Sequence, residues 1–548
     1  MDSTTRGIPL ADEQLGALTL GGFLREVCTK YADKEALVFH GPDGVVRKTY
    51  EQVFDEAHVA ARALVARGVT KDTRVGVLAT NRPEWITAVF GVALAGGTCV
   101  ALSTFAKASE LEYMLRVGDV SLLIVEREVL DRDFVAEITE LCPELAKKEV
   151  VYSQRLPFLR RAVSIGAASG AFESWADFLK GPLAPAALVD AIANEVAPTD
   201  RGMIFFSSGS TSKPKAIVHA HRAAAIQCWR WRKIYNVDDN VRTWAANGFF
   251  WSGNFASALG TTFAAGGCLV LQRAFVGGEA LQLIEKERVT LPIAWPHQWA
   301  RLVDDPGYAS ADLSTLKYVG ETSPLRNHPK VKTDWQEPMF CYGNTETLTL
   351  NTAYPSGTDP EVVKGTHGLP LGGNIVRIVE PVSGRVLNRN EPGEIAVKGP
   401  TTMFGYLRVA LEDTFDEEGF FRTGDGGFVD DKGRLHWQGR LNDIIKTGGA
   451  NVSPLEIDAV LAECPGVKIA ATVGVPHDTL GEIVVACVVP QAGASIDEAL
   501  VRGFVSKRLS SFKVPRRVLF VAESDLELTA SNKVKAAPLK ALAAQRLA

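Results

Sequence analysis

Short apolar runs of strand length alternate with apolar stretches of helical spacing through the first 200 residues. Residues 51–67 and 84–95 carry apolar side chains at helical spacing, whereas residues 74–80 and 99–102 form runs too short for helices. Neighbouring parallel strands need crossover connections of this kind, so the order predicts a parallel sheet covered by helices. Further strands are expected at residues 121–126 and 266–271, and a further helix at residues 279–288.

The sequence changes character near residue 365. Short apolar strands with Gly and Pro turns appear at residues 375–379 and 393–399, which predicts a small antiparallel sheet or barrel. Beyond residue 440 helices and strands mix again, and about a hundred residues are enough for a separate domain. We therefore expect an α/β protein with two parallel-type subdomains, a small barrel-like subdomain and a small α+β C-terminal domain.

Composition and charge narrow the class of protein. The chain has 548 residues, with 59 Lys and Arg against 64 Asp and Glu and 46% hydrophobic residues, so it is neither disordered nor a dedicated nucleic-acid binder. No apolar run reaches the roughly 20 residues of a membrane-spanning helix, and no signal-peptide pattern occurs. The eight cysteines lack metal-ligand spacing, and no histidine cluster is present. We expect a large cytoplasmic enzyme without a transmembrane segment; the sequence leaves open whether it forms a homo-oligomer.

Residues 203–216 are the most informative segment. Four apolar residues lead directly into hydroxyl and glycine residues and then two lysines. Small residues let backbone N–H groups converge on one point, hydroxyls add donors and lysines add charge, a combination that suits a phosphate. A solvated serine-rich turn would have the same composition, so the segment alone leaves both interpretations open. The candidate phosphate ligands are Ser207, Ser208, Gly209, Ser210, Thr211, Ser212 and Lys215.

Five segments, in order along the chain, resemble the motifs of the acyl-adenylate-forming superfamily. This superfamily includes acyl- and aryl-CoA ligases, luciferases and the adenylation domains of peptide synthetases. The segments are residues 207–216, 342–346, 422–425, 439–456 and 528–535. Residues 75–125 share the resemblance, which therefore covers nearly the whole chain. Ser212, Ala216 and Asn532 replace glycines of the family pattern.

The resemblance implies an ATP site. Thr345 would donate a hydroxyl to a phosphate oxygen, and Glu346 would offer a carboxylate to the Mg²⁺ that accompanies ATP. Asp425 would accept both ribose hydroxyls, and Arg440 would hold the ribose or phosphate side of the nucleotide. The Tyr342 ring can stack on a nucleobase. The remaining candidates are Gly343 and Asn344 in the same motif, and Gly320, Glu321 and Thr322 on the adenine side.

The resemblance also implies two half-reactions. A carboxylate attacks the α-phosphate of ATP to give an acyl-AMP and pyrophosphate, while Lys533 bridges the acyl oxygen and the phosphate. Coenzyme A then takes the acyl group. Residues 1–439 would bind ATP and acid, and residues 440–442 would form a hinge.

The hinge residue is Asn442, and residues 443–548 would form a mobile lid. Rotation of the lid would bring Lys446, Gly448 and Gly449 to the site for the second half-reaction.

The acid itself, a small-molecule carboxylic acid, is expected to lie against residues 247–254. Phe250, Trp251 and Asn254 are the candidates for this pocket. Residues 243–272 hold no charged side chain, whereas amino-acid-activating relatives carry an aspartate here, so an acid with an apolar or aromatic body is favoured. The aromatic residues could equally be core packing.

Two other functions stay open. One is an adenylating enzyme that passes the acyl group to an amine or a carrier protein. The other is a degenerate nucleotide- or acid-binding protein, suggested by the replaced glycines.

Overall fold

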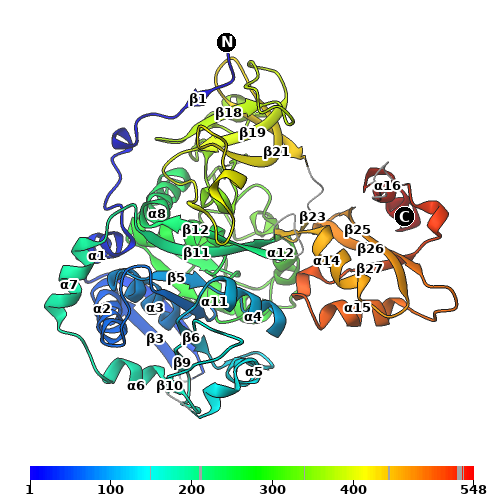
Figure 1. The fold of residues 1–548 in the computed structure, drawn as a ribbon. Coiled ribbons are helices and arrows are strands. Elements are labelled where there is room, and N and C mark those ends of the chain that lie inside the picture. The colour runs from blue at the N-terminus through cyan, green and yellow to red at the C-terminus, as the bar shows by residue number, and fades with distance from the viewer. Residues whose placement is uncertain are drawn as a thin grey trace.

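The structure is a computed structural model that describes residues 1–42, 44–147, 150–208, 213–338, 340–441, 445–527, 534 and 536–547. Two sheets with helices between them form the greater part of the molecule (Figure 1). The first has eight strands in the order β10-β9-β6-β4-β5-β11-β12-β20, and the strands from β10 to β11 are parallel. Its strands are Phe172–Ser174, Arg161–Ile165, Leu122–Glu126, Arg74–Leu78, Thr98–Ala101, Arg201–Ser208, Pro214–Ala220 and Gly405–Tyr406.

The second sheet has five strands in the order β15-β13-β14-β2-β3, of which the first four are parallel. They are Leu291–Ile293, Arg242–Ala245, Cys268–Leu271, Glu35–Gly41 and Gly44–Thr49. Helices α1, α2, α3 and α8 supply the apolar residues of the core beside these sheets. Their bounds are Leu20–Lys30, Tyr50–Ala66, Pro83–Leu94 and His221–Tyr235. The β-α-β order expected from the sequence, and the α/β class with it, are confirmed.

The uncharged run of residues 243–272 lies inside this core. It continues from β13 through α9 (Ser252–Asn254), a π-helical turn at Phe255–Gly260 and α10 (Thr261–Ala265) into β14. Every residue of the π-helical turn is buried. Each buried aromatic ring of such a segment contributes a large apolar area, which explains why charged side chains are missing from it.

A third, antiparallel sheet has the order β1-β18-β19-β21-β22 and lies at the top of Figure 1. Its strands are Thr5–Arg6, Ile375–Val379, Gly393–Lys398, Phe421–Val429 and Leu435–Arg440. This is the small barrel-like part expected from the Gly- and Pro-rich texture. Residues 316–319, which look like a strand in the sequence, form none, because the N–H groups of Lys317 and Tyr318 both donate to the carbonyl of Thr290 and no regular ladder develops.

The chain from Ile445 onward folds around a sheet of its own, and we call this part the C-terminal lobe; the preceding part is the N-terminal body. The lobe sheet runs β24-β23-β26-β25, with β27 paired to β26. Its strands are Ile445–Thr447, Ala450–Val452, Val467–His477, Gly481–Pro490 and Arg517–Phe520, and its helices are α14 (Pro454–Ala462), α15 (Glu498–Ser506) and α16 (Ala536–Leu547). In the described part of the chain, no helix is long and apolar enough to cross a membrane.

One buried ion pair ties the N-terminal segment to the rest of the body. The side chain of Arg230 on α8 is 2% exposed and pairs at 3.1 Å with Glu13, which ends the 3₁₀ turn Leu10–Glu13. Arg230 also donates to the carbonyl of Gly372, and Glu13 accepts the Gly372 N–H at 2.7 Å. The pair therefore joins three segments distant in the sequence.

We expect Glu13→Ala to lower the free energy of unfolding by about 3 kcal/mol, because it leaves a buried guanidinium without its counter-charge. The measurement is thermal unfolding by calorimetry. Asp12→Ala is the matched control, since Asp12 is an exposed neighbour on the same turn. Equal midpoints for the two variants would contradict this role of the pair.

Candidate active site

The candidates for the phosphate and ribose sites lie where three parts of the N-terminal body meet: the hairpin β11–β12, the segment 342–347 and strands β21 and β22 of the antiparallel sheet. Hydrogen bonds from side chains join the segment to the hairpin and to β21.

The phosphate-loop candidates lie at the end of the hairpin. Ser207 faces Lys215 across the antiparallel ladder, and the Lys215 Nζ lies 4.4 Å from the ring centre of Tyr406. Ala216 faces Phe206 inside a regular buried strand, so a methyl group in place of the family glycine is accommodated there. Ser208 ends β11. Gly209, Ser210, Thr211 and Ser212 lie outside the described residues.

Segment 342–347 is held in shape by its own residues. Asn344 caps the short 3₁₀ turn Thr345–Thr347: its Oδ1 accepts the Thr347 N–H at 2.9 Å. At Gly343 a Cβ atom would lie 1.4 Å from the carbonyl oxygen of Thr349, so only glycine fits. The motif's glycine and asparagine therefore serve the backbone of the turn that presents Thr345 and Glu346.

His219 on β12 fixes this turn to the hairpin. Its Nε2 donates to the backbone carbonyl of Thr345 at 2.8 Å. Burial lowers the pKa of His219 to about 4, so the ring is neutral at physiological pH. His219 is not among the candidates from the motifs, because a histidine on an apolar strand gives no sign in the sequence of the group that it contacts.

The Glu346 carboxylate is oriented by Tyr406 of β20, whose hydroxyl donates to Oε1 at 2.9 Å. Among the described residues, no cluster of three or more His, Cys, Asp or Glu is placed to hold a metal ion. Mg²⁺ in nucleotide sites is typically held by one or two carboxylates together with the substrate phosphates. A single oriented carboxylate beside a phosphate-loop candidate fits that requirement.

Asp425 on β21 is buried and held at both oxygens. The Tyr342 hydroxyl donates to Oδ2 at 2.9 Å, and the Trp437 indole N–H donates to Oδ1 at 3.2 Å. A carboxylate oxygen has two lone pairs, so a carboxylate of this kind can accept several hydrogen bonds. Arg440 lies opposite Asp425 in the β21–β22 ladder, and its side chain lies outside the described part.

On the adenine side, Gly320 lies under the carboxylate of Glu337, because a Cβ at Gly320 would be 1.8 Å from the Glu337 Oε2. Glu321 accepts the Glu337 N–H at 3.2 Å, and Thr322 donates to Glu337 at 3.4 Å. Burial and the negative charge of Glu321 raise the pKa of Glu337. The three candidates thus lie together around an acid that the motif comparison did not include.

The lid candidates lie against the N-terminal body. Gly448 and Gly449 have positive φ angles of 55° and 84°, and added Cβ atoms would lie 2.9 Å from His297 and 2.7 Å from Trp295 respectively. The Lys446 Nζ lies 3.7 Å from the ring centre of Trp437, whose indole holds Asp425. Asn442 and Lys533 lie outside the described residues.

A cavity of about 540 Å³ runs between the body and the lobe. Its wall includes Asn247 and Phe250 of the body and Gly448 of the lobe. The aromatic rings of Trp251 and Phe512, one from each part, are 5.9 Å apart. Trp251 also lies 6.2 Å from Trp295, and Asn254 is buried on α9. Of the acid-pocket candidates, Phe250 therefore reaches the cavity.

The sequence of the chain matches a known enzyme family along most of its length. The sequence pattern of the AMP-binding enzyme family matches residues 24–407, and that of the AMP-binding enzyme C-terminal domain matches residues 456–533. The 3-[(3aS,4S,7aS)-7a-methyl-1,5-dioxo-octahydro-1H-inden-4-yl]propanoyl:CoA ligase of Mycobacterium tuberculosis is 30% identical over 503 residues, 90% of this chain and 94% of that protein. A putative acyl-CoA synthetase of Bacillus subtilis, YngI, is 27% identical over 94% of this chain and 95% of its own.

Two solved enzyme structures share the fold of this chain. The amide bond synthetase McbA of Marinactinospora thermotolerans superposes with a TM-score of 0.74 at 25% identity, covering 95% of this chain and 99% of its own. The anthranilate CoA ligase AuaEII, in complex with anthranoyl-AMP, gives a TM-score of 0.65 at 25% identity, covering 98% and 99%.

The chain belongs to the AMP-binding enzyme family. Within that family it is an ATP-dependent, acid-activating ligase of the acyl-CoA synthetase type. The resemblance stated from the motifs is thereby confirmed, and so is the enzyme class.

We expect Asp425→Ala to raise the KM for ATP about tenfold or more, because charge-assisted hydrogen bonds to the ribose would be lost. Tyr342→Phe removes one of the bonds that orient Asp425 and should raise the same KM by a smaller factor. Steady-state kinetics at varied ATP gives both values. Asp413→Asn, at an exposed position, is the control. An unchanged KM in Asp425→Ala would rule out the ribose contact.

Proposed function

We propose that the chain converts a carboxylic acid with an apolar or aromatic body into an acyl-AMP and then into a coenzyme A thioester. The observation that supports this most directly is the cavity between body and lobe. One end reaches the uncharged segment expected to hold the acid, and the lobe's glycine loop forms part of the wall. Such a passage suits a long thiol cofactor that must meet an enclosed acyl group.

In the first half-reaction two anions, the carboxylate and the ATP triphosphate, must approach each other. Lys215 and the hydroxyls of residues 207–212 would bind the phosphates, and Thr345 would add a donor. Asp425 would orient the ribose, which aligns the α-phosphate with the acid. Mg²⁺, held by the phosphates and Glu346, would neutralise phosphate charge.

In the second half-reaction the acceptor is coenzyme A, and positive charge along the cavity suits its phosphates. Lys107, Arg301 and Arg516 all line the cavity. Arg301, Arg516, His297 and Gly448 of the glycine loop line the same cavity. Burial, together with the charges of Arg301 and Arg516, lowers the pKa of His297.

The acid is proposed to carry a ring. No charged residue occurs between Thr243 and Gln272, so no counter-ion for a second charge on the acid is available in this segment. The mycobacterial ligase and the anthranilate ligase are both named for acids with ring systems.

Three further expectations from the sequence remain predictions. They are a cytoplasmic location, the domain limits 1–439 and 443–548, and the hinge at Asn442.

The test is a panel of aliphatic, alicyclic and aromatic acids, read by acid-dependent pyrophosphate release. Coenzyme A, amines and a carrier protein are then supplied separately with each active acid, and products are identified by mass spectrometry. Acyl-CoA formation with ring-bearing acids is the expected result. Activation without any acyl-CoA across the panel would overturn the coenzyme A assignment.

Transfer to an amine is the second candidate, because McbA is an amide bond synthetase with the same fold. An amine acceptor needs no phosphate-binding groups, so the basic residues of the cavity favour coenzyme A.

The third possibility is a degenerate binding protein, which would show no ATP–pyrophosphate exchange with any acid. Ala216 gives this alternative no support, since it occupies an ordinary strand position.

We expect Lys533→Ala to slow acyl-AMP formation roughly a hundredfold or more, because a cation bridging the two reacting anions would be lost. Thioester formation from supplied acyl-AMP should be largely spared. Single-turnover measurements of the two half-reactions separate these effects. Lys535→Ala, two residues further along, is the control. Equal loss of both half-reactions in Lys533→Ala would exclude the bridging role.

We expect Gly449→Ala to show the opposite split. The added Cβ would lie 2.7 Å from the Trp295 indole and would sit at a positive φ, so the loop could not keep its place. Thioester formation from supplied acyl-AMP should fall at least about tenfold, while pyrophosphate release in the first turnover is retained. Gly503→Ala is the control, because a Cβ there meets open space. Unchanged thioester formation in Gly449→Ala would remove the loop from the second half-reaction.

A further inference from the structure

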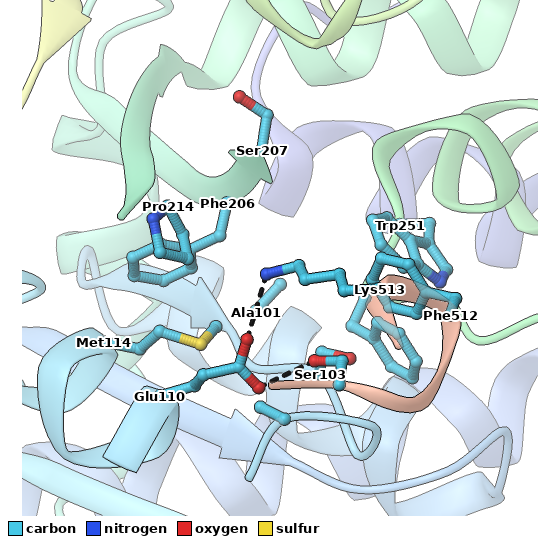
Figure 2. A pocket seen from close by; sticks show the side chains of 13 residues that line it. Ala101, Ser103, Glu110, Met114, Phe206, Ser207, Pro214, Trp251, Phe512 and Lys513 are labelled. Atoms are coloured by element: carbon cyan, nitrogen blue, oxygen red, sulfur yellow. Dashed lines mark hydrogen bonds and ion pairs between the residues drawn. The ribbon is translucent and has the colours of Figure 1, made fainter. Parts of the chain in front are cut away.

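Three charged side chains from two parts of the molecule meet in a buried cluster, and two of them line a small pocket together with Ser207 at the end of β11. Lys513, in the 3₁₀ turn Ser511–Lys513 of the lobe, pairs with Glu110 of the body at 2.9 Å and with Glu456 of the lobe at 2.8 Å. Their side chains are 5%, 6% and 2% exposed respectively. Figure 2 shows Glu110 and Lys513 facing each other, with Trp251 and Phe512 beside the lysine.

One contact of Glu110 lies within the body and does not involve the lobe. Glu110 lies in the first turn of α4 (Ala108–Val117), where its Oε2 accepts the Lys107 N–H at 2.9 Å and closes the start of the helix. Oε2 also accepts the Ser510 hydroxyl of the lobe at 2.7 Å, while Oε1 takes the Lys513 ammonium. The body thus presents a preoriented carboxylate that receives two donors from the lobe.

The lobe carries its own half of the cluster. Glu456 lies in the first turn of α14, and its pairing with Lys513 lies wholly within the lobe, so that pair stays with the lobe as one unit. Only Glu110 belongs to the body. Its two bonds therefore exist in this arrangement of lobe and body and are lost in any arrangement that moves the turn away.

The same arrangement places the glycine loop. β24, which directly follows Gly448 and Gly449, packs against the turn that holds Lys513. A lobe held at Lys513 therefore holds the loop against Trp295 and His297. Ser109, next to Glu110, makes a further contact across the same boundary, donating to the backbone carbonyl of Arg508 at 3.2 Å.

We propose that Glu110 is a positioning residue for the second half-reaction: its bonds to Lys513 and Ser510 hold the lobe in the arrangement that presents Gly448 and Gly449 to the cavity. This inference rests on the proposed function for its catalytic consequence. The arrangement itself can be measured without coenzyme A. Acyl-AMP formation does not require the bonds of Glu110 to the lobe, because the lobe is expected to have another orientation in the first half-reaction.

The first measurement reports the arrangement alone. Ser109→Cys and Arg508→Cys together place two thiols across the boundary, and a short bismaleimide reagent joins them when lobe and body adopt this arrangement. The initial rate of cross-linking is compared in proteins with and without the substitution Glu110→Gln. This substitution keeps the size of the side chain but removes its charge. We expect the initial rate of cross-linking to fall about tenfold, the change produced by losing a charged hydrogen bond.

The second measurement compares the half-reactions of single variants. Glu110→Gln should slow thioester formation from supplied acyl-AMP about tenfold and leave first-turnover pyrophosphate release unchanged. Ser510→Ala, which removes the other donor from the lobe side, should act in the same direction with a smaller factor. Glu112→Gln is the matched control on the same helix, because Glu112 pairs with Arg155 of the body and not with the lobe.

The outcomes separate this proposal from the proposed function. Unchanged cross-linking in Glu110→Gln overturns the proposal whatever the acceptor is. Equal slowing of both half-reactions would show a general loss of structure and overturn it as well. Reduced cross-linking in an enzyme that never makes acyl-CoA would support the positioning role and overturn the coenzyme A assignment instead.

Discussion

The site depends on the joining of three separately folded pieces of backbone at the short turn Thr345–Thr347. His219 ties that turn to the phosphate-loop hairpin, Tyr406 orients its glutamate, and Tyr342 connects it to Asp425 on the antiparallel sheet. Hydrogen bonds of this kind are directional, so each of the three pieces constrains the other two. The parallel sheets and the antiparallel sheet contribute little to the site separately, and their relative placement is what assembles it.

Two buried ion-pair clusters join parts of the molecule that are distant in the sequence. Arg230 and Glu13 join the N-terminal segment to α8, and Lys513 joins the lobe to the body. Buried ion pairs add little net stability, because the cost of removing two charges from water offsets their attraction, but a partner left alone is strongly unfavourable. Such pairs therefore discriminate between arrangements that complete them and arrangements that do not.

Much of the fold was predictable because its signals are local. Apolar spacing within a dozen residues located α2, α3 and the strands β4 and β5 that follow them, and the shift to short strands near residue 365 located the antiparallel sheet. Residues 316–319 show the limit of such local signals: apolar residues predict burial, whereas a strand also needs a neighbouring strand with unpaired backbone groups. Periodicity reports burial more directly than it reports pairing.

The candidate site was predictable only as far as its motifs reach. Glycine and carboxylate positions stand close together in the sequence, but the side chains that orient them come from far away, as Trp437, Tyr406 and His219 do. The sequence does not show which group an aromatic residue or a histidine contacts, because the hydrogen bond that it makes joins distant segments. The same holds for Glu110, whose partners lie about 400 positions further on.

Trp437 contacts both the ribose-binding candidate Asp425 and Lys446 of the lobe. Its indole N–H holds the carboxylate expected to bind the ribose, while its ring face carries the Lys446 ammonium of the lobe. A nucleotide bound at Asp425, as proposed, would lie one hydrogen bond away from Trp437, whose ring face contacts the lobe in this arrangement. A substitution at Trp437 would therefore affect the ribose-binding candidate and the contact with the lobe together.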